Sequence, residues 1–293
     1  MSAPVWQRRR AAAVQVWQEF RGNTGGLVGA AFIVALVVAS LVAPLVVDQA
    51  GLDVVTATGS PLEPPSGRFW LGTDESGRSI LLLTFWGARV SLLVGFAATL
   101  LSVLVGTLVG VVSAHFGGWV SAVLMRVTDF FLVLPALVLA AVLMAVLPKS
   151  MWTLILAIGA TSWPTTARLV RAQTLAVEGR PYIERSKALG GGHAHVIGKH
   201  VLPSVLPLVF ANTTLVVGGS IIAESTLAFL GMAGPEISWG SMLDRANSSG
   251  AVTAGAWWYL LPPGVMIVLV VLSFTLVGRA LETVLNPRLK GDR

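Results

Sequence analysis

Long apolar stretches separated by short polar segments dominate the pattern of this chain. A membrane-crossing helix needs about 20 mostly apolar residues, and several stretches approach that length. In chain order they are Gly26–Val47, Val90–Val112, Leu124–Leu147, Trp152–Val170, Ser204–Leu230 and Tyr259–Leu281. The pattern therefore predicts an all-α integral membrane protein with about six transmembrane helices.

Two of these stretches contain a residue that is unusual in an apolar helix. Pro164 interrupts the fourth stretch, where neighbouring groups would have to satisfy the freed backbone carbonyl. Glu224 is the acid of the fifth stretch and, at about 1.5 Å of rise per residue, it lies roughly 30 Å beyond Pro203. We expect either a solvated interfacial glutamate or an acid facing a transport pathway near an outer gate, paired with a basic residue or polar backbone.

The polar segments divide the chain into a transmembrane domain, residues 26–285, between an N-terminal segment, residues 1–25, and a short tail, residues 286–293. Inside the domain, the connection over residues 48–87 is long and rich in Pro and Gly. The connection over residues 171–203 is polar and basic. We predict that these two connections lie on opposite sides of the membrane.

The distribution of positive charge predicts the orientation. If the N-terminus is cytoplasmic, fifteen of the twenty Lys and Arg residues lie on the inner side of the predicted spans. Since cytoplasmic loops are enriched in Lys and Arg, we expect both termini and residues 171–203 inside, and residues 48–87 outside.

Short motifs add local expectations. Gly25 and Gly29, and likewise Gly106 and Gly110, have the spacing of close helix contacts. The loop 231–258 is rich in tryptophan, which is typical of a membrane interface. Its tryptophans are Trp239, Trp257 and Trp258.

Composition supports the membrane assignment and excludes several function classes. The chain is 55% hydrophobic and 12% charged, whereas soluble domains contain about 25% charged residues. With no cysteine, a disulfide, a thiolate zinc site and a cysteine nucleophile are excluded. The net charge of +6 is attributed to cytoplasmic loops, and no nucleic-acid partner is expected.

The chain lacks an obvious energy source or metal site. A phosphate-binding loop needs G-x-x-x-x-G-K-[ST], and the nearest match, Gly198-Lys199-His200, lacks both the first glycine and the final hydroxyl. The spacing of the histidines at 193, 195 and 200 does not favour a metal site. Asp129 is a possible pathway residue, although an ion pair with Arg126 on the same helix face is the simpler expectation.

The segment from Arg180 to Pro203 has the pattern of a helical elbow. Pro181 suits the first turn of a helix, and Gly190 suits a C-terminal cap that needs positive φ. A second short helix and Pro203 would then lead into the next span. Ile183 and Leu189 would face a partner, so the segment predicts a lever for another subunit; a helix lying on the membrane surface is the alternative.

This segment resembles the cytoplasmic coupling motif of ABC-importer permeases. The resemblance rests on Glu184, Ala188, Leu189 and Gly190, followed by Leu202 and Pro203. Arg185 and Ser186 stand where that family commonly has two alanines. In the family this elbow docks into a groove on an ATPase, which the resemblance implies for these residues.

Other stretches are similar to the "C"-type permeases of the dipeptide/oligopeptide/nickel branch. Ser79 stands where that branch usually has aspartate. The matching stretches are Leu71–Arg78, Gly87–Leu92, Phe116–Trp119, Asp129 with Pro135, Ala223-Glu224, Phe229–Gly231, Ser238–Leu243 and Lys199–Pro203.

The resemblance implies a five-part importer in a bacterial cell membrane. Its parts would be this chain, a second homologous permease, two ATP-binding subunits and an extracellular substrate-binding protein. Dipeptides or oligopeptides are the expected cargo, with nickel or another small solute as the alternative. ATP and Mg would bind the ATPase subunits, and no cofactor is expected in this chain. A secondary transporter and a membrane scaffold without transport are the rival classes.

Overall fold

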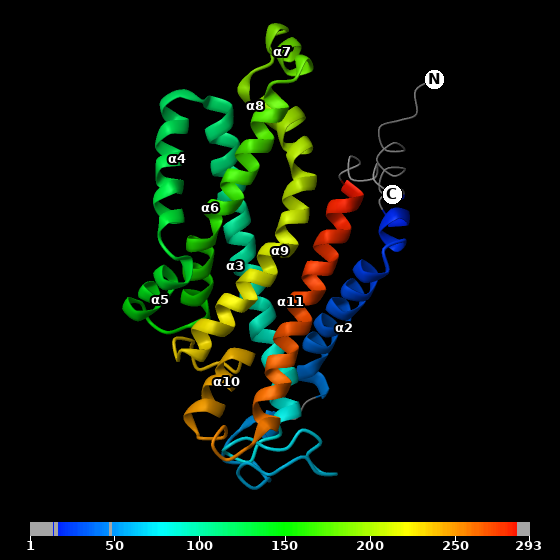
Figure 1. The fold of residues 1–293 in the computed structure, drawn as a ribbon, viewed down its shortest axis with the longest axis vertical. Helices are drawn as coiled ribbons and strands as arrows, with labels where there is room; N and C mark the ends of the chain where they lie inside the picture. The colour runs from blue at the N-terminus through cyan, green and yellow to red at the C-terminus, as the bar shows by residue number, and fades with distance from the viewer. Residues whose placement is uncertain (1–13, 15–16, 47–48, 286–293) are drawn as a thin grey trace.

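The computed structural model describes residues 14, 17–46 and 49–285, and within this part the protein is a bundle of long helices (Figure 1). Predictions for most of residues 1–16, for Val47 and Asp48 and for the tail 286–293 lie outside the described residues. The long helices are α2 (Thr24–Val46), α3 (Ile80–Phe116), α4 (Gly118–Val133), α6 (Met151–Glu178), α9 (Leu202–Phe229) and α11 (Trp257–Leu285). The shorter elements are the 3₁₀ turn η1 (Gln49–Leu52), α5 (Ala136–Val146), α7 (Pro181–Ala188), α8 (His193–Val196), the π-helical turn η2 (Ile197–Val201) and α10 (Trp239–Ser248).

The long helices run alternately up and down the long axis of the molecule in chain order (Figure 1). One end of the bundle carries α7 and α8, together with the start of α2 and the end of α11; we call it the elbow end. The opposite end carries α10 and the loop after α2, and we call it the α10 end (Figure 1).

The all-α membrane fold predicted from the apolar pattern is confirmed. Within the described residues, four helices are long and apolar enough to cross a membrane, and the bent pair α4–α5 makes a fifth if it counts as one span. The four are Thr24–Leu45, Ile80–Phe116, His193–Phe229 and Trp257–Val284. The helix α6, which contains the predicted span Trp152–Val170 and has 28 residues, is not among these four, and its sequence includes Ser, Thr, Pro and Arg residues.

The predicted span Leu124–Leu147 is not one continuous helix. The chain bends by 86° between α4 and α5. Leu134 is extended, with φ −80° and ψ 132°, because the ring of Pro135 disfavours helical geometry in the residue before it. The third apolar stretch is therefore an upright helix followed by a short helix lying across the bundle at the α10 end (Figure 1).

The predicted limits of both long connections also need correction. The loop expected over residues 48–87 ends at Ser79, because the apolar residues from Ile80 onward already belong to α3. Arg89 is accommodated inside that helix by stacking its guanidinium 4.7 Å from the ring centre of Trp86. The connection expected over residues 171–203 begins as helix, since α6 continues to Glu178.

Glycines allow close helix packing at three of the four expected positions; at Gly25 a Cβ would come no closer than 3.5 Å to a neighbour. A Cβ on Gly106 or Gly110 would come within 2.7 Å of the backbone of α6, at Trp163 O and Ala167 O. A Cβ on Gly29 would come equally close to the carbonyl of Ser273 in α11. Small residues let the backbones approach, so α3 and α6 form one tightly packed pair.

The loop at the α10 end is held by its own polar groups. Arg78 is buried, pairs with Asp74 at 2.6 Å and donates to the carbonyl of Leu52 at 3.3 Å. Tyr259 donates its hydroxyl to Glu75 over 2.5 Å. The charged motif that follows Leu71 therefore fastens this loop to the start of α11.

Candidate coupling and translocation sites

The elbow, residues 180–203, begins with a helix that its own residues start and stop. Arg180 is extended at the N-cap, and Pro181 occupies the first turn, where a missing N–H costs nothing. Glu184 lies in the first turn and Lys187 in the last, so both charges complement the helix dipole.

Gly190 ends this helix as predicted. Its φ is +85°, which is unfavourable for a residue with a Cβ. The N–H of Gly190 donates to the carbonyl of Lys187, and the N–H of Gly191 donates to the carbonyl of Ser186. These two bonds form a Schellman cap, which fixes the direction in which the chain leaves α7.

The second short helix of the elbow is continuous with the next span. α8 passes into α9 through the π-helical turn η2, in which Leu202 donates its N–H to the carbonyl of Ile197. Pro203 lies in the first turn of α9. His193 to Phe229 therefore forms one helical rod of 37 residues that joins the elbow to the membrane-spanning part.

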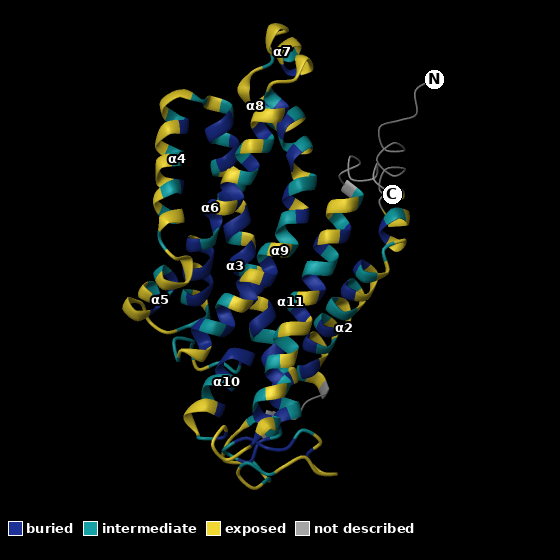
Figure 2. Cartoon of the chain, in the orientation of Figure 1, coloured by how far each residue is buried: buried dark blue, intermediate teal, exposed yellow. Residues whose placement is uncertain are grey.

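One side of the elbow, which includes Ile183, packs against the bundle, and the other, which includes Leu189, is exposed; we call them the anchored side and the free side. Ile183 is completely buried against Val196, Val201 and Val205, so the expectation that it faces a partner is wrong. Leu189 is 82% exposed. Glu184, Ala188, Gly190 and Pro203 are also exposed, and Leu202 is half-buried; Figure 2 shows exposed residues over most of α7.

Glu224 is enclosed in the bundle, so the expected solvated glutamate is wrong. Its Oε2 accepts hydrogen bonds from Ser91 and Ser225, each at 3.1 Å. The hydroxyl of Ser91 also accepts the backbone N–H of Trp239 at 3.2 Å. Glu224 thus joins α3, α9 and α10 through hydroxyls and not through a basic residue.

Trp239 is a core residue and not the interfacial tryptophan expected from composition. It is 0% exposed, and its indole N–H donates to the carbonyl of Thr84 at 2.9 Å. Trp257, in contrast, is 56% exposed.

Asp129 pairs between helices and not within its own helix. Its carboxylate lies 2.6 Å from the guanidinium of Arg168 in α6, which corrects the expected pair with Arg126. Both side chains are about half exposed, and exposed pairs of this kind contribute roughly 0–1 kcal/mol. The pair helps to set α4 beside α6.

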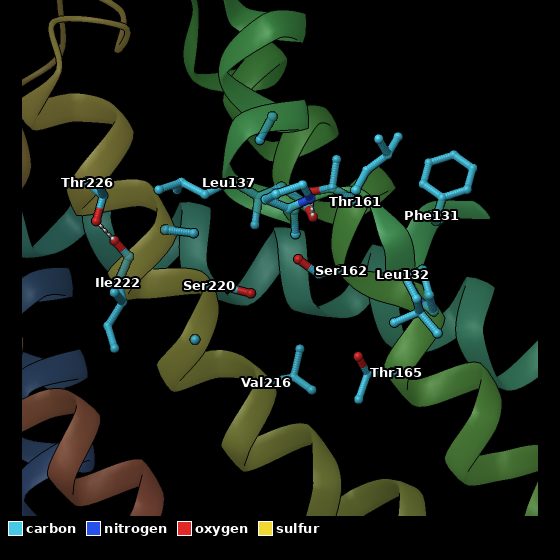
Figure 3. Close-up of a pocket in the computed structure, with 18 of the residues that line it drawn as sticks. Phe131, Leu132, Leu137, Thr161, Ser162, Thr165, Val216, Ser220, Ile222 and Thr226 are labelled. Atoms are coloured by element: carbon cyan, nitrogen blue, oxygen red, sulfur yellow. Dashed lines mark hydrogen bonds between the residues drawn. The ribbon is translucent and has the colours of Figure 1, made fainter. Parts of the chain in front are cut away.

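A pocket of about 720 Å³ lies between the α4–α5 bend, α6 and α9. Figure 3 shows Ser162 and Thr165 of α6 on one side of it and Val216 and Ser220 of α9 on the other. None of the residues that line it is charged. The side-chain hydroxyls of Ser162 and Thr165 make no hydrogen bond within the described part of the chain, so they can bond to a molecule bound in the pocket.

Sequence reasoning missed this pocket because one of its walls comes from α9, which the elbow separates from α4, α5 and α6 in the chain. The available signals were the two prolines that line it. Pro135 creates the bend, and Pro164 lies within α6. Glu224 and Asp129 are not among the lining residues.

Comparison with known proteins assigns the chain to a family. Residues 103–291 match the model of the binding-protein-dependent transport system inner membrane component, and residues 13–65 match the N-terminal TM domain of oligopeptide transport permease C.

Individual relatives cover nearly the whole chain. The oligopeptide transport system permease protein OppC of Bacillus subtilis is 32% identical, over 95% of this chain and 92% of its own length. The dipeptide permease DppC of the same organism is 32% identical, over 94% of this chain and 85% of its own length. The di/tripeptide permease DppC of Pseudomonas aeruginosa is 33% identical, over 94% of this chain and 92% of its own length. The chain belongs to the family of inner-membrane components of binding-protein-dependent transport systems, and it is a multi-pass membrane permease.

Proposed function

We propose that this chain is a permease subunit of an ATP-driven importer for dipeptides or oligopeptides. The observation that carries the proposal is the exposed, glycine-capped elbow, continuous with a helix that lines an uncharged pocket. The names of the relatives indicate the cargo class. In this reading the chain itself performs no chemistry.

The proposed assembly contains a second homologous permease, two ATP-binding subunits and an extracellular substrate-binding protein. ATP and Mg bind the ATPase subunits, which dock on the free side of the elbow through Glu184, Ala188, Leu189 and Gly190. The elbow and both termini then lie in the cytoplasm of a bacterial cell.

The rod from His193 to Phe229 supplies a mechanical route from the elbow to the cargo. Asn212 lines the pocket nineteen residues after His193, which corresponds to roughly 28 Å along a helix. Closure of the ATPases would move the elbow, and the rod would carry that movement to the pocket wall. Alternating access follows from repeated closure and release.

The pocket suits the main chain of a peptide. Free hydroxyls can hydrogen-bond peptide N–H and C=O groups, which every peptide presents irrespective of its side chains. The lining residues include no His, Cys, Asp or Glu. Since imidazole is a ligand suited to nickel, the pocket supports peptide cargo over a bare metal ion.

Uptake by the reconstituted complex tests this function. Proteoliposomes that hold both permeases and both ATPase subunits are supplied with the binding protein. They should transport a radiolabelled tripeptide only when ATP is present on the side of the membrane that carries the ATPase subunits. Unlabelled peptides with acidic, basic or apolar side chains should compete, and Ni²⁺ should not. Uptake driven by an ion gradient without the ATPases would instead establish a secondary transporter.

A further inference from the structure

Four segments meet around one carboxylate at the elbow end. Glu178, the last residue of α6, contacts His115 Nδ1 of α3 through one oxygen and accepts from Lys187 Nζ of α7 at 2.7 Å through the other. His115 Nε2 lies 2.8 Å from His193 Nδ1 at the start of α8. The ring of Phe116 packs on His193, with ring centres 5.3 Å apart.

This cluster is more enclosed than an ordinary surface ion pair. The side chains of His115 and Glu178, at its centre, are 1% and 12% exposed, whereas Lys187, at 47%, and His193 are open to solvent. Burial raises the pKa of the Glu178 carboxyl, but the hydrogen bonds from Lys187 and His115 outweigh it, so this pKa lies below its usual value. An ionised carboxylate forms stronger hydrogen bonds than a neutral one.

The proton positions are consistent along the chain of contacts. The His115 tautomer with its proton on Nδ1 donates to the carboxylate and leaves Nε2 as an acceptor. His193 can then donate its own Nδ1–H to that nitrogen. The four side chains therefore form one connected network, in which the charge of Glu178 is paired with that of Lys187.

The network gives the elbow an attachment to α3 that the chain itself does not provide. By covalent connection the elbow joins only α6, through Arg180, and α9, through η2. His115 lies at the end of α3, which packs closely on α6 along Gly106 and Gly110. Lys187 and His193 therefore tie both sides of the elbow to the α3–α6 pair.

We propose that Glu178 is a positioning residue for energy coupling, which makes movement of the elbow pass to the α3–α6 pair as well as to α9. The proposal rests on the proposed function, because it assumes that the elbow receives movement from an ATPase. The α6 and α9 helices line opposite sides of the pocket. Without the network, an elbow that pivots at its covalent joint with α6 would move the α9 wall and leave the α6 wall in place. Loss of the network should let ATP be hydrolysed without matching cargo movement.

The test measures tripeptide molecules imported per ATP hydrolysed in the complete reconstituted complex. Lys187→Ala removes an exposed side chain and Glu178→Gln removes the charge at the centre. Both should lower this ratio several-fold while the ATPase subunits still co-purify with the permease. Lys187→Arg keeps a cation at the carboxylate and should restore the ratio.

Arg279→Ala is the matched control. Arg279 is an exposed cation near the elbow end of α11, with no carboxylate partner among the described residues, and its loss should leave the ratio unchanged. An unchanged ratio in Lys187→Ala overturns the proposal, as does a fall of uptake and hydrolysis in equal proportion. Failure of Lys187→Arg to restore the ratio, or an equal effect of Arg279→Ala, also overturns it.

A separate variant distinguishes failure of this proposal from failure of the proposed function. Leu189→Asp places a charge on the free side of the elbow, away from the network. If the elbow docks the ATPases, this variant should lose them during purification. Retention of fully coupled ATPases by Leu189→Asp would contradict the docking role itself, whatever the Lys187 variants show.

Discussion

Glu224 joins helices that are far apart in the sequence. Its hydrogen-bond donor Ser91 is 133 residues away, and Ser91 in turn accepts the N–H of Trp239 from a third helix. A charged group buried in a membrane protein needs polar partners. The hydroxyl contacts identify Glu224 as a structural link between α3, α9 and α10, and they change the prediction for its substitution.

Replacing Glu224 separates hydrogen bonding from charge. In Glu224→Gln one amide oxygen can still accept from Ser91 and Ser225, so stability should change by less than about 1 kcal/mol. Glu224→Ala removes the acceptor and leaves a cavity, which should cost about 2–4 kcal/mol. Thermal unfolding of the detergent-purified complex measures both.

The neighbouring residue Ser225 provides a control, since Ser225→Ala removes one donor and keeps the carboxylate. It should destabilise less than Glu224→Ala. Equal destabilisation by Glu224→Gln and Glu224→Ala would show that the negative charge, and not the hydrogen bonding, holds these helices.

The partners of single charged residues are what sequence reasoning could not supply. Asp129 has Arg126 three positions away, yet its partner is Arg168 on another helix. Local spacing shows which pairs can form within a helix, but the pairing across helices depends on packing. The same limit applied to Glu224. Helical rise gave its position along α9, but it could not show that α10 packs beside it and shields it from solvent.

At the scale of the element, the sequence predicted the ends of a helix where a proline or a glycine fixes the backbone geometry. Pro181 and Gly190 predicted both ends of α7, because proline fixes φ and glycine tolerates positive φ. Pro135 carries the same kind of signal, but a proline in a membrane helix can be accommodated by a kink or by a break. The 86° bend between α4 and α5, and the pocket that it helps to form, could therefore be identified only from the structure.

The cap of the elbow offers a prediction with a matched control. At Gly190 the φ of +85° makes Gly190→Val strained by about 1–2 kcal/mol or more, although a Cβ would meet nothing within 4 Å. A cost of this size shifts a local equilibrium about 5- to 30-fold. Peptide uptake and cargo-stimulated ATP hydrolysis by the reconstituted complex should therefore fall together.

Gly192→Val is the control, because Gly192 has φ −70° and ψ 168° and equally open surroundings. The same side chain is then added two residues away in a conformation that valine favours. Uptake should stay close to that of the unsubstituted protein. Equal losses at both positions would show that bulk on the elbow surface, and not the direction of the chain after α7, causes the defect.

At the scale of the whole molecule, alternation of the long helices places both described ends of the bundle on the elbow side. The start of α2 and the end of α11 lie near α7, whereas the loop after α2 lies at the α10 end (Figure 1). One measurement of the side on which the elbow lies therefore also orients α2 and α11. The charge distribution predicts that this side is the cytoplasm.

Labelling of single introduced cysteines tests the orientation, because the natural chain has none. Thr58 at the α10 end and Ala188 on the elbow are both exposed, so each accepts cysteine with little effect on packing. In intact cells a membrane-impermeant maleimide should label Thr58→Cys and leave Ala188→Cys unlabelled. Expressing the permeases without the ATPases keeps the elbow uncovered, and permeabilised cells should then label at both positions. The expected orientation rests on the charge distribution, in which fifteen basic residues are expected inside and five outside. Labelling of Ala188→Cys alone in intact cells would show the reverse orientation, with the elbow outside the compartment that holds ATP.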